Sequence, residues 1–231
     1  MTADDRMEPA GGSAARACAT TVLLADDQEM TRQGIRSLIE TRPEFLVVAD
    51  VGDGESAIHK IESLKPDVAV LEFALPHLSA LAVIERAHSG GSKTRFLILS
   101  ERPRDQHVRD ALSVGASGFL LKSASASQLF NAIQVAHRGQ FFLSPEISHV
   151  VVEAARDPHR TGQSVLLGLT TRELEILQLI AEGFSTKEVS SRLGISCRTS
   201  DSHRASVMRK LGVHKVVGLV RFAIREGLVD A

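Results

Sequence analysis

Hydrophobic and polar positions alternate in blocks through the first 140 residues of the chain. Short, nearly continuous apolar runs lie at Thr21–Ala25, Phe45–Asp50, Asp67–Glu72, Phe96–Ser100 and Gly118–Leu121. Apolar residues at helical spacing fill the segments between them: Met30–Thr41, Glu55–Leu64, Leu78–Ala87, Arg104–Val114 and Ala126–His137. Strands that alternate with helices in this way predict an α/β fold, a doubly wound five-stranded parallel sheet with helices on both faces.

The pattern changes beyond residue 168, where only helical spacing remains. Ser185 and Glu188 form a capping box at one helix start, and Gly194 lies where that helix should stop. A short turn followed by a helix capped at Ser196 is typical of a helix-turn-helix, whose second helix enters the major groove of DNA. We therefore expect an all-α domain with helices at 171–182, 186–193, 197–211 and 214–227.

The chain divides into four segments on these patterns. Residues 1–19 are rich in Ala, Gly and small polar residues, which predicts a disordered tail. The α/β domain occupies 20–140 and the helix-turn-helix domain 169–231. Between them, 141–168 should form a turn with a connecting helix, followed by a polar linker that contains Pro and Gly.

Composition and charge narrow the class of protein. No apolar run approaches eighteen residues, so no membrane span is predicted, and two cysteines, Cys18 and Cys197, favour a reducing cytoplasm. Residues 169–231 hold ten Lys and Arg against seven Asp and Glu, whereas the preceding residues hold seventeen against twenty-one. A basic module behind a mildly acidic domain favours double-stranded DNA as a partner.

The second helix of the helix-turn-helix carries the candidate DNA contacts. From Arg192 to Lys215 there are six basic residues and one acid. Basic side chains at this place neutralise phosphates, although the same pattern also fits a bundle whose charges are only solvated. The expected DNA-binding residues are Lys187, Arg198, Thr199, Asp201, Ser202, Arg204, Arg209 and Lys210.

The wider sequence favours the DNA-binding interpretation. The motifs at Leu169–Glu173, Ile180–Gly183, Ser185–Glu188, Arg192–Ser196 and Met208–Val213 resemble the LuxR/FixJ/NarL-type DNA-binding domain throughout its length. The resemblance implies a homodimer contact through the last helix. Four residues share one face of that helix and either form this contact or pack inside the bundle: Val216, Leu219, Val220 and Ala223.

The recognition helix departs from the family pattern at two positions. Where the family usually has an apolar residue followed by Lys, this chain has Ser200 and Asp201. Ser200 falls on the core-facing side, where it loses methyl contacts. Asp201 either reads a base, since a carboxylate can accept from cytosine N4, or weakens binding by repelling phosphates. Cys197 is either a redox-sensing thiol or a small tolerated residue.

Polar residues follow the strands of the α/β domain at their carboxyl ends. Asp26 and Asp27 follow the first strand, Glu72 ends the third, Ser100 ends the fourth and Lys122 follows the fifth. Because sites in a doubly wound sheet form beyond these ends, we expect the five side chains to converge on one rim. Three carboxylates balanced by a lysine suit a hard cation with oxygen ligands.

This rim resembles that of the response-regulator receiver domain, flavodoxin-like in fold, over about residues 22–138. The resemblance implies possible magnesium binding at Asp26 and Asp27, with no other cofactor established. It also implies a phosphate contact by Ser100 and Lys122, and a switch aromatic at Phe119, here a ring without a hydroxyl. Glu72 occupies the position of the phosphoacceptor Asp, and the loop Pro76–Ala80 lacks the Gly and Asp usual after the proline.

Glu72 changes the expected control of the protein. One extra methylene moves the carboxylate by about 1.5 Å, and transfer chemistry is sensitive to that displacement. Glu72 then pairs with Lys122 in a partly active-like state, or the domain answers to another ligand or partner, or it is an inert dimerisation platform. We expect a non-enzymatic, phosphorylation-independent transcriptional regulator with no assigned kinase; the alternative is an interaction protein that binds DNA weakly.

Overall fold

The computed structural model describes residues 19–101, 104–150, 152, 166 and 168–229. All five predicted strands are present: β1 (Thr20–Ala25), β2 (Phe45–Val51), β3 (Val68–Glu72), β4 (Arg95–Ser100) and β5 (Gly118–Leu121). The helices between them are α2 (Glu29–Glu40), α3 (Gly54–Leu64), α4 (Ala80–Ser89), α5 (Asp105–Ser113) and α6 (Ala126–His137). The α/β pattern of the sequence is therefore confirmed.

The sheet is parallel throughout, but it has six strands where the sequence predicted five. Its order is β2-β1-β3-β4-β5-β6, and the added edge strand β6 (Phe142–Leu143) pairs with Gly118 and Phe119 of β5. Two residues are too few to show a strand pattern in the sequence, so only the pairing with β5 reveals it. A single 3₁₀ turn, η1 (Pro145–Ile147), follows. The predicted polar linker, and all but residue 19 of the predicted tail, lie outside the described residues.

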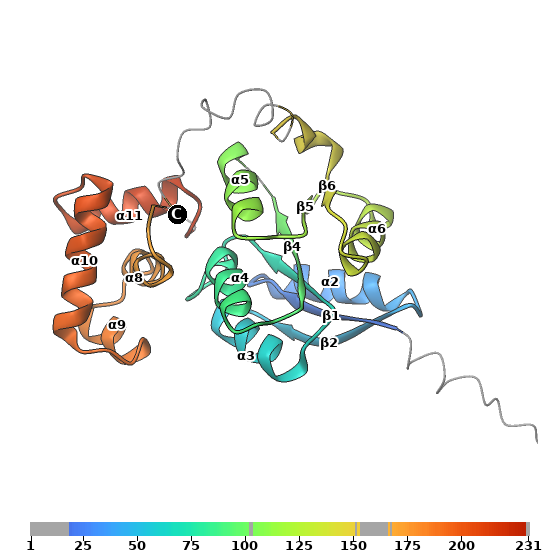
Figure 1. The fold of residues 1–231 in the computed structure, drawn as a ribbon, viewed down its shortest axis with the longest axis horizontal. Helices are drawn as coiled ribbons and strands as arrows, with labels where there is room; N and C mark the ends of the chain where they lie inside the picture. The colour runs from blue at the N-terminus through green and yellow to red at the C-terminus, as the bar shows by residue number, and fades with distance from the viewer. Residues whose placement is uncertain (1–18, 102–103, 151, 153–165, 167, 230–231) are drawn as a thin grey trace, which may run out of the picture.

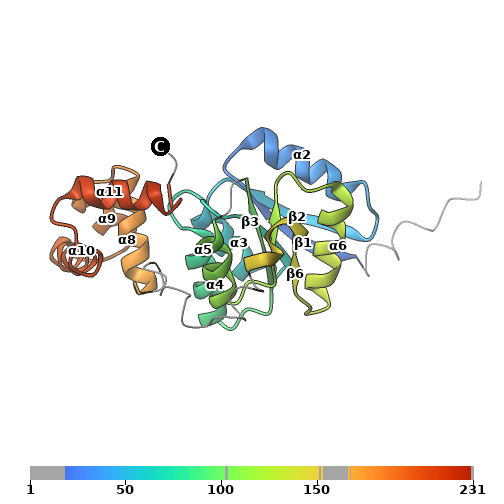
Figure 2. The ribbon, with the colours of Figure 1, turned by 90° about the horizontal axis from the view of Figure 1, so that it is seen from above.

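Helices cover both faces of the sheet (Figures 1 and 2). Successive residues of β1 point to opposite faces, as the two-residue period of a strand requires. Val22 and Leu24 join one apolar cluster with α2 and α6, whereas Leu23 and Ala25 join another with α3, α4 and α5. Burial on both faces explains why the strands read as continuous apolar runs.

The C-terminal domain consists of α8 (Thr171–Ala181), α9 (Thr186–Arg192), α10 (Cys197–Leu211) and α11 (Val216–Arg225). Capping boxes at Thr170 and Ser185 start α8 and α9, the second of them as predicted. Gly194 lies between α9 and α10 with a φ of +62°, a conformation that favours glycine. The helix-turn-helix therefore follows the predicted boundaries closely, and α8 packs against both α10 and α11.

The two domains contact one another. Figures 1 and 2 show α8 beside α4, with α10 on the side of the C-terminal domain turned away from the sheet. Buried residues of α4 and α5 belong to the same apolar cluster as buried residues of α8 and α11. Within the described ranges, no helix has the length and apolar character to cross a membrane.

Candidate functional site

The carboxyl ends of the parallel strands bring the predicted rim residues together. Asp27, Glu72, Ser100 and Lys122 line one cavity of about 630 Å³. Asp26 lies directly beneath, fully buried, and Asp27 is exposed. β1, β3, β4 and β5 each supply part of this rim, because parallel strands end at the same edge of the sheet.

Lys122 joins two buried carboxylates at the centre of the rim. Its Nζ lies 2.7 Å from Oδ2 of Asp26 and 2.5 Å from Oε2 of Glu72. Burial would lower the pKa of the Lys122 ammonium, but the hydrogen bonds and charges of Asp26 and Glu72 raise it overall. Lys122 therefore stays protonated, and the larger glutamate side chain reaches it directly.

The pKa of the Glu72 carboxyl is shifted in the direction opposite to that of an ordinary ion-paired carboxyl. Burial raises the pKa of Glu72 above its usual value, and the charge of Asp26 adds to the rise against the opposing effect of Lys122. One lysine serves two carboxylates, so Glu72 is only partly compensated for its loss of water. The rim thus holds one charge-sharing triad of Asp26, Glu72 and Lys122.

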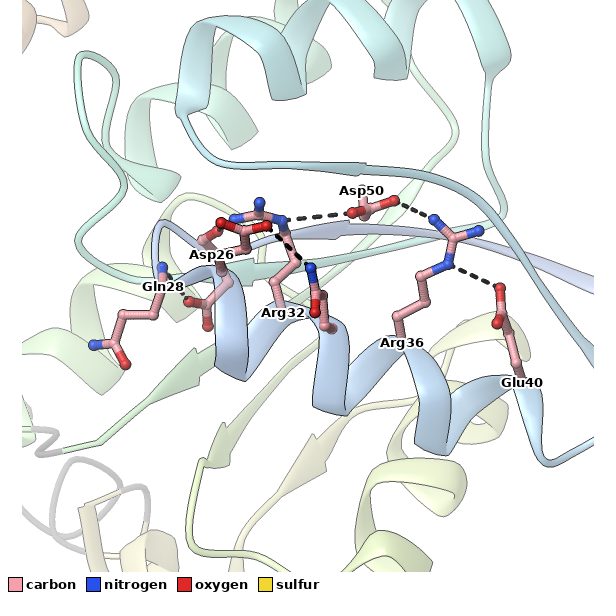
Figure 3. Close-up of polar contacts among 8 residues, drawn as sticks. Asp26, Gln28, Arg32, Arg36, Glu40 and Asp50 are labelled. Carbon is pink, nitrogen blue, oxygen red and sulfur yellow. Dashed lines mark hydrogen bonds and ion pairs between the residues drawn. The ribbon is translucent and has the colours of Figure 1, made fainter.

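Two arginines of α2 pair with Asp50 of β2, and one of them also holds the loop that carries Asp26 (Figure 3). Arg32 donates to the backbone oxygen of Asp26 at 2.5 Å and lies 3.5 Å from Asp50. Arg36 pairs with the same Asp50 and, at 2.9 Å, with Glu40. This support was not predicted from the sequence, although the spacing of four residues between Arg32 and Arg36 places both on one helix face.

Phe119, at the place of the switch aromatic, lies fully inside the domain. Its ring centroid is 6.5 Å from that of Phe73, the residue after Glu72. Phe73 in turn stacks on His107 of α5 at 4.3 Å. An apolar ring without a hydroxyl is suited to this enclosed position, because a buried hydroxyl needs a partner.

The arrangement of the rim does not favour a divalent cation. Asp26 and Glu72 both turn an oxygen to Lys122, so the ammonium lies between these two carboxylates. Among the residues that the structure describes, no three His, Cys, Asp or Glu side chains gather as a metal site. Asp26 and Asp27 supply the hard oxygen donors that Mg²⁺ prefers, and Oδ2 of Asp26 is bonded to Lys122.

Arg104, His107 and Gly227 also line the rim cavity, and none of them was predicted from the sequence as a site residue. Gly227 belongs to the C-terminal domain and packs against the His107 ring, while Arg104 donates to the backbone oxygen of Arg225. Burial lowers the pKa of His107, and the charge of Arg104 adds to this effect. These contacts join residues more than a hundred positions apart, so local sequence patterns carry no signal for them.

The second candidate site is the outer face of α10. Lys187, at the start of α9, is exposed. On α10 itself the residues Arg198, Thr199, Ser202 and Arg209 are exposed. The ion pairs of the described residues include none for Lys187, Arg198 or Arg209.

Asp201, Arg204 and Thr186 form a closed polar group between α9 and α10. Oδ1 of Asp201 lies 3.0 Å from Nη2 of Arg204 and accepts from Oγ1 of Thr186 at 3.3 Å. Nη1 of Arg204 donates to the same Thr186 oxygen at 3.1 Å. The acid that interrupts the basic face is thus occupied within the domain, and it orients the arginine beside it.

Lys210 is also occupied within the domain. Its Nζ lies 2.6 Å from Oε2 of Glu173 and 3.1 Å from the backbone oxygen of Gly168. Burial alone would raise the pKa of Glu173, but donors from Lys210, Thr170 and Ser206 lower it to about 2. Lys210 therefore contributes contacts within the domain, and its contact with DNA stays a prediction.

The remaining predicted residues of this domain divide between its core and its surface. Ser200 is buried, on the core-facing side as predicted. Leu219 and Ala223 are fully buried, which favours the second of the two alternatives for this face, packing inside the bundle, and α11 packs on α8. Val216 is 44% exposed and Val220 is half-buried. Cys197 is exposed, with Sγ 3.2 Å from the Ser190 hydroxyl.

Comparison with known proteins matches both halves of the chain. The family described as response regulator receiver domain matches residues 22–134, and the luxR family of bacterial regulatory proteins matches residues 167–223. The oxygen regulatory protein NreC of Staphylococcus carnosus is 29% identical over 90% of this chain and 99% of its own. The transcriptional regulatory protein DegU of Brevibacillus brevis is 28% identical over 90% of this chain and 94% of its own.

A solved structure is also similar to this chain. The response regulator ChrA, from a heme-sensing two-component system, is 28% identical with a TM-score of 0.51, over 92% of this chain and 100% of its own.

Proposed function

We propose a phosphorylation-independent mode of control for this chain, which is a DNA-binding response regulator with a receiver domain followed by a LuxR-type helix-turn-helix domain. Such a regulator is a transcription factor and not an enzyme. Its partner is double-stranded DNA, and we place it in the cytoplasm, where that partner lies. The rival interpretation, an interaction protein that binds DNA weakly, is not favoured.

The observation that carries this proposal is the ion pair of Glu72 with Lys122 at 2.5 Å. The resemblance to receiver domains assigns these two positions to the phosphoryl acceptor and to the lysine that contacts the phosphate. Here the acceptor position holds a longer carboxylate that already bonds the lysine. A phosphoryl donor would have to break this pair and react at an oxygen displaced by about 1.5 Å.

Glu72 imitates the phosphorylated state only in part. A carboxylate carries one negative charge, whereas a phosphoryl group carries nearly two and offers three acceptor oxygens. The pair with Lys122 supplies the single contact that both groups share. We infer that the rim is fixed in one state, and that Asp26 and Asp27 act without a required Mg²⁺ ion.

DNA recognition is proposed to rest on the exposed residues of the α9–α10 unit. Arg198 and Arg209 suit phosphate or guanine contacts, and Thr199 and Ser202 suit phosphate or base hydrogen bonds. A homodimer on a two-fold-related site is proposed through the outward side of α11. Val216, Val217 and Ile224 are exposed there, at 44%, 65% and 36%.

Treatment with an acyl phosphate tests the proposal. The wild type should bind a selected operator with the same affinity before and after treatment, whereas Glu72→Asp restores the usual acceptor and should respond. Mass spectrometry checks whether a phosphoryl group is added. A Glu72-dependent gain of affinity in the treated wild type would contradict phosphorylation-independent control.

A further inference from the structure

One side of α8 carries four polar residues that all contact the receiver domain. Positions 171, 175, 178 and 182 are four, three and four residues apart, so they share a single helix face. Two of them are almost completely buried, Glu175 at 2% and Gln178 at 1% exposure. We call this set the docking stripe: Thr171, Glu175, Gln178 and Glu182.

The first half of the docking stripe contacts α4. Thr171 donates through Oγ1 to Oε2 of Glu85 at 2.6 Å. Glu175 lies 2.6 Å from Nη2 of Arg86, and its other oxygen lies 2.8 Å from Nη1 of Arg172. A buried acid between two arginines is well compensated, and the removal of either arginine would leave it poorly paired.

The second half of the docking stripe contacts the loop between β3 and α4. Gln178 donates from Nε2 to the backbone oxygen of Leu75 at 2.6 Å and to Glu182 at 2.9 Å. Glu182 accepts from the backbone N–H of His77 at 2.7 Å, and its second oxygen lies 3.0 Å from Nδ1 of the same residue. This loop begins directly after Glu72, so α8 holds the segment that follows the rim.

His77 shows that the contact is specific. Its φ is +67°, a conformation that is uncommon for a residue other than glycine. The receiver resemblance leads one to expect glycine after Pro76, and glycine would adopt this conformation without strain. His77 instead offers a ring that bonds Glu182 and lies 5.9 Å from the Phe184 ring. Both of these partners belong to the C-terminal domain.

Docking of the two domains leaves the recognition helix open. Arg198, Thr199, Ser202 and Arg209 are exposed while the docking stripe is engaged. Figures 1 and 2 both show α10 on the far side of α8 from the receiver domain. The contact therefore fixes the orientation of α10 without covering its outer face.

We propose that the docking stripe is the receptor for the β3–α4 loop of the chain's own receiver domain, and that the docked arrangement is the form that binds DNA. The two domains then act as one body, and α10 is presented by the receiver rather than released from it. This inference takes from the proposed function only that the outer face of α10 contacts DNA. It does not depend on whether Glu72 can be phosphorylated.

A cross-link that locks the docked arrangement tests the proposal. Glu85→Cys and Thr171→Cys, joined by a short bismaleimide in a Cys18→Ser, Cys197→Ser background, hold α4 and α8 together. The locked protein should bind an operator, selected with the wild type, within about threefold of the same protein before cross-linking. A larger loss would show that docking blocks DNA, and would overturn the proposal.

Loosening the contact gives a second test that does not use DNA. In the wild type, ¹⁵N relaxation should give one rotational correlation time for both domains. Gln178→Ala with Glu182→Ala should separate the two values, while Glu44→Ala, which removes an exposed acid away from the interface, should leave them equal. Separate values in the wild type, or a shared value in the double variant, would overturn the docking. The acyl phosphate experiment is independent of both tests, so the two proposals can fail separately.

Discussion

Each domain of this regulator holds a buried glutamate bonded to a lysine, and the two pairs behave differently. Glu72 lies 2.5 Å from Lys122 and Glu173 lies 2.6 Å from Lys210. The pKa of Glu72 is raised by burial, whereas that of Glu173 is lowered to about 2 despite its burial. The distance from the carboxylate to the lysine therefore does not decide the direction of the pKa shift.

The other neighbours of each carboxyl explain the difference. Glu173 accepts from the backbone N–H and hydroxyl of Thr170 and from the hydroxyl of Ser206, in addition to its lysine. Glu72 shares its lysine with Asp26. A carboxylate that accepts from several donors has its charged form stabilised. A carboxylate that shares one cation with a second carboxylate keeps part of the free-energy cost of losing its water. Only a carboxylate that shares its cation, such as Glu72, readily changes its pKa when its surroundings change.

Removal of each lysine gives the largest expected contrast. Lys122→Ala leaves two buried carboxylates facing each other and should destabilise the protein by about 3–5 kcal/mol at pH 8. Lys210→Ala leaves Glu173 its three other donors and should cost only about 1 kcal/mol. Urea denaturation measures both, with Lys60→Ala as an exposed control. Equal losses for the two variants would break the comparison.

Acid unfolding tests the lowered pKa of Glu173. A carboxyl whose folded pKa lies below its unfolded value of 4.5 adds stability above pH 4.5, and this is lost as pH falls toward 2. A folded pKa of about 2 corresponds to about 3 kcal/mol. Glu173→Gln should remove this contribution at neutral pH and flatten the stability profile between pH 4.5 and 2, while Glu44→Gln should not. An unchanged profile in Glu173→Gln would contradict the assigned pKa.

For Glu72 we expect stability to depend on pH in the opposite direction. A carboxyl whose folded pKa is raised adds stability that is present below its unfolded pKa and lost as pH rises through the folded value. Glu72→Gln should therefore gain stability relative to the wild type as the pH rises above 4.5. Stability measured across this range in both proteins checks the direction. A relative loss with rising pH would show that Lys122 dominates the site.

Asp201 extends the comparison to an exposed carboxylate, with the smallest expected effect. Asp201→Asn weakens its pair with Arg204, a surface interaction that is worth about 0.2–1 kcal/mol. Stability should hardly change, whereas operator selectivity should shift because Arg204 is no longer oriented. Selection from random duplexes with both proteins measures this. An identical selected site would leave Asp201 without a role in orienting Arg204.

The sequence predicts most of the fold because its signals are local. Apolar runs placed the five strands β1 to β5, a capping box placed the start of α9, and α10 begins and ends at the predicted residues. The edge strand β6 was missed because two residues carry no period. The rim could be predicted as well, since Asp26, Glu72 and Lys122 follow strand ends that parallel pairing brings together.

The parts that could not be predicted depend on contacts between distant segments. Leu219 and Ala223 form an apolar face that fits a dimer or a bundle equally well, and only the packing of α11 on α8 decides. The meeting of His107 with Gly227 depends on the placement of one domain on the other. The docking stripe does have a sequence signal, polar residues at helical spacing along α8, but its partners lie about a hundred residues away.

The apolar cluster shared by the receiver and the C-terminal domain bears on how such proteins can be recombined. Side chains of α4, α5, α8 and α11 pack in one cluster, and the docking stripe matches one particular loop. A hybrid that joins this C-terminal domain to a foreign receiver would bury Glu175 without its partner Arg86. The two domains are therefore a matched pair in any engineered exchange of domains. A new input is better introduced by changes within this receiver domain than by replacement of the whole domain.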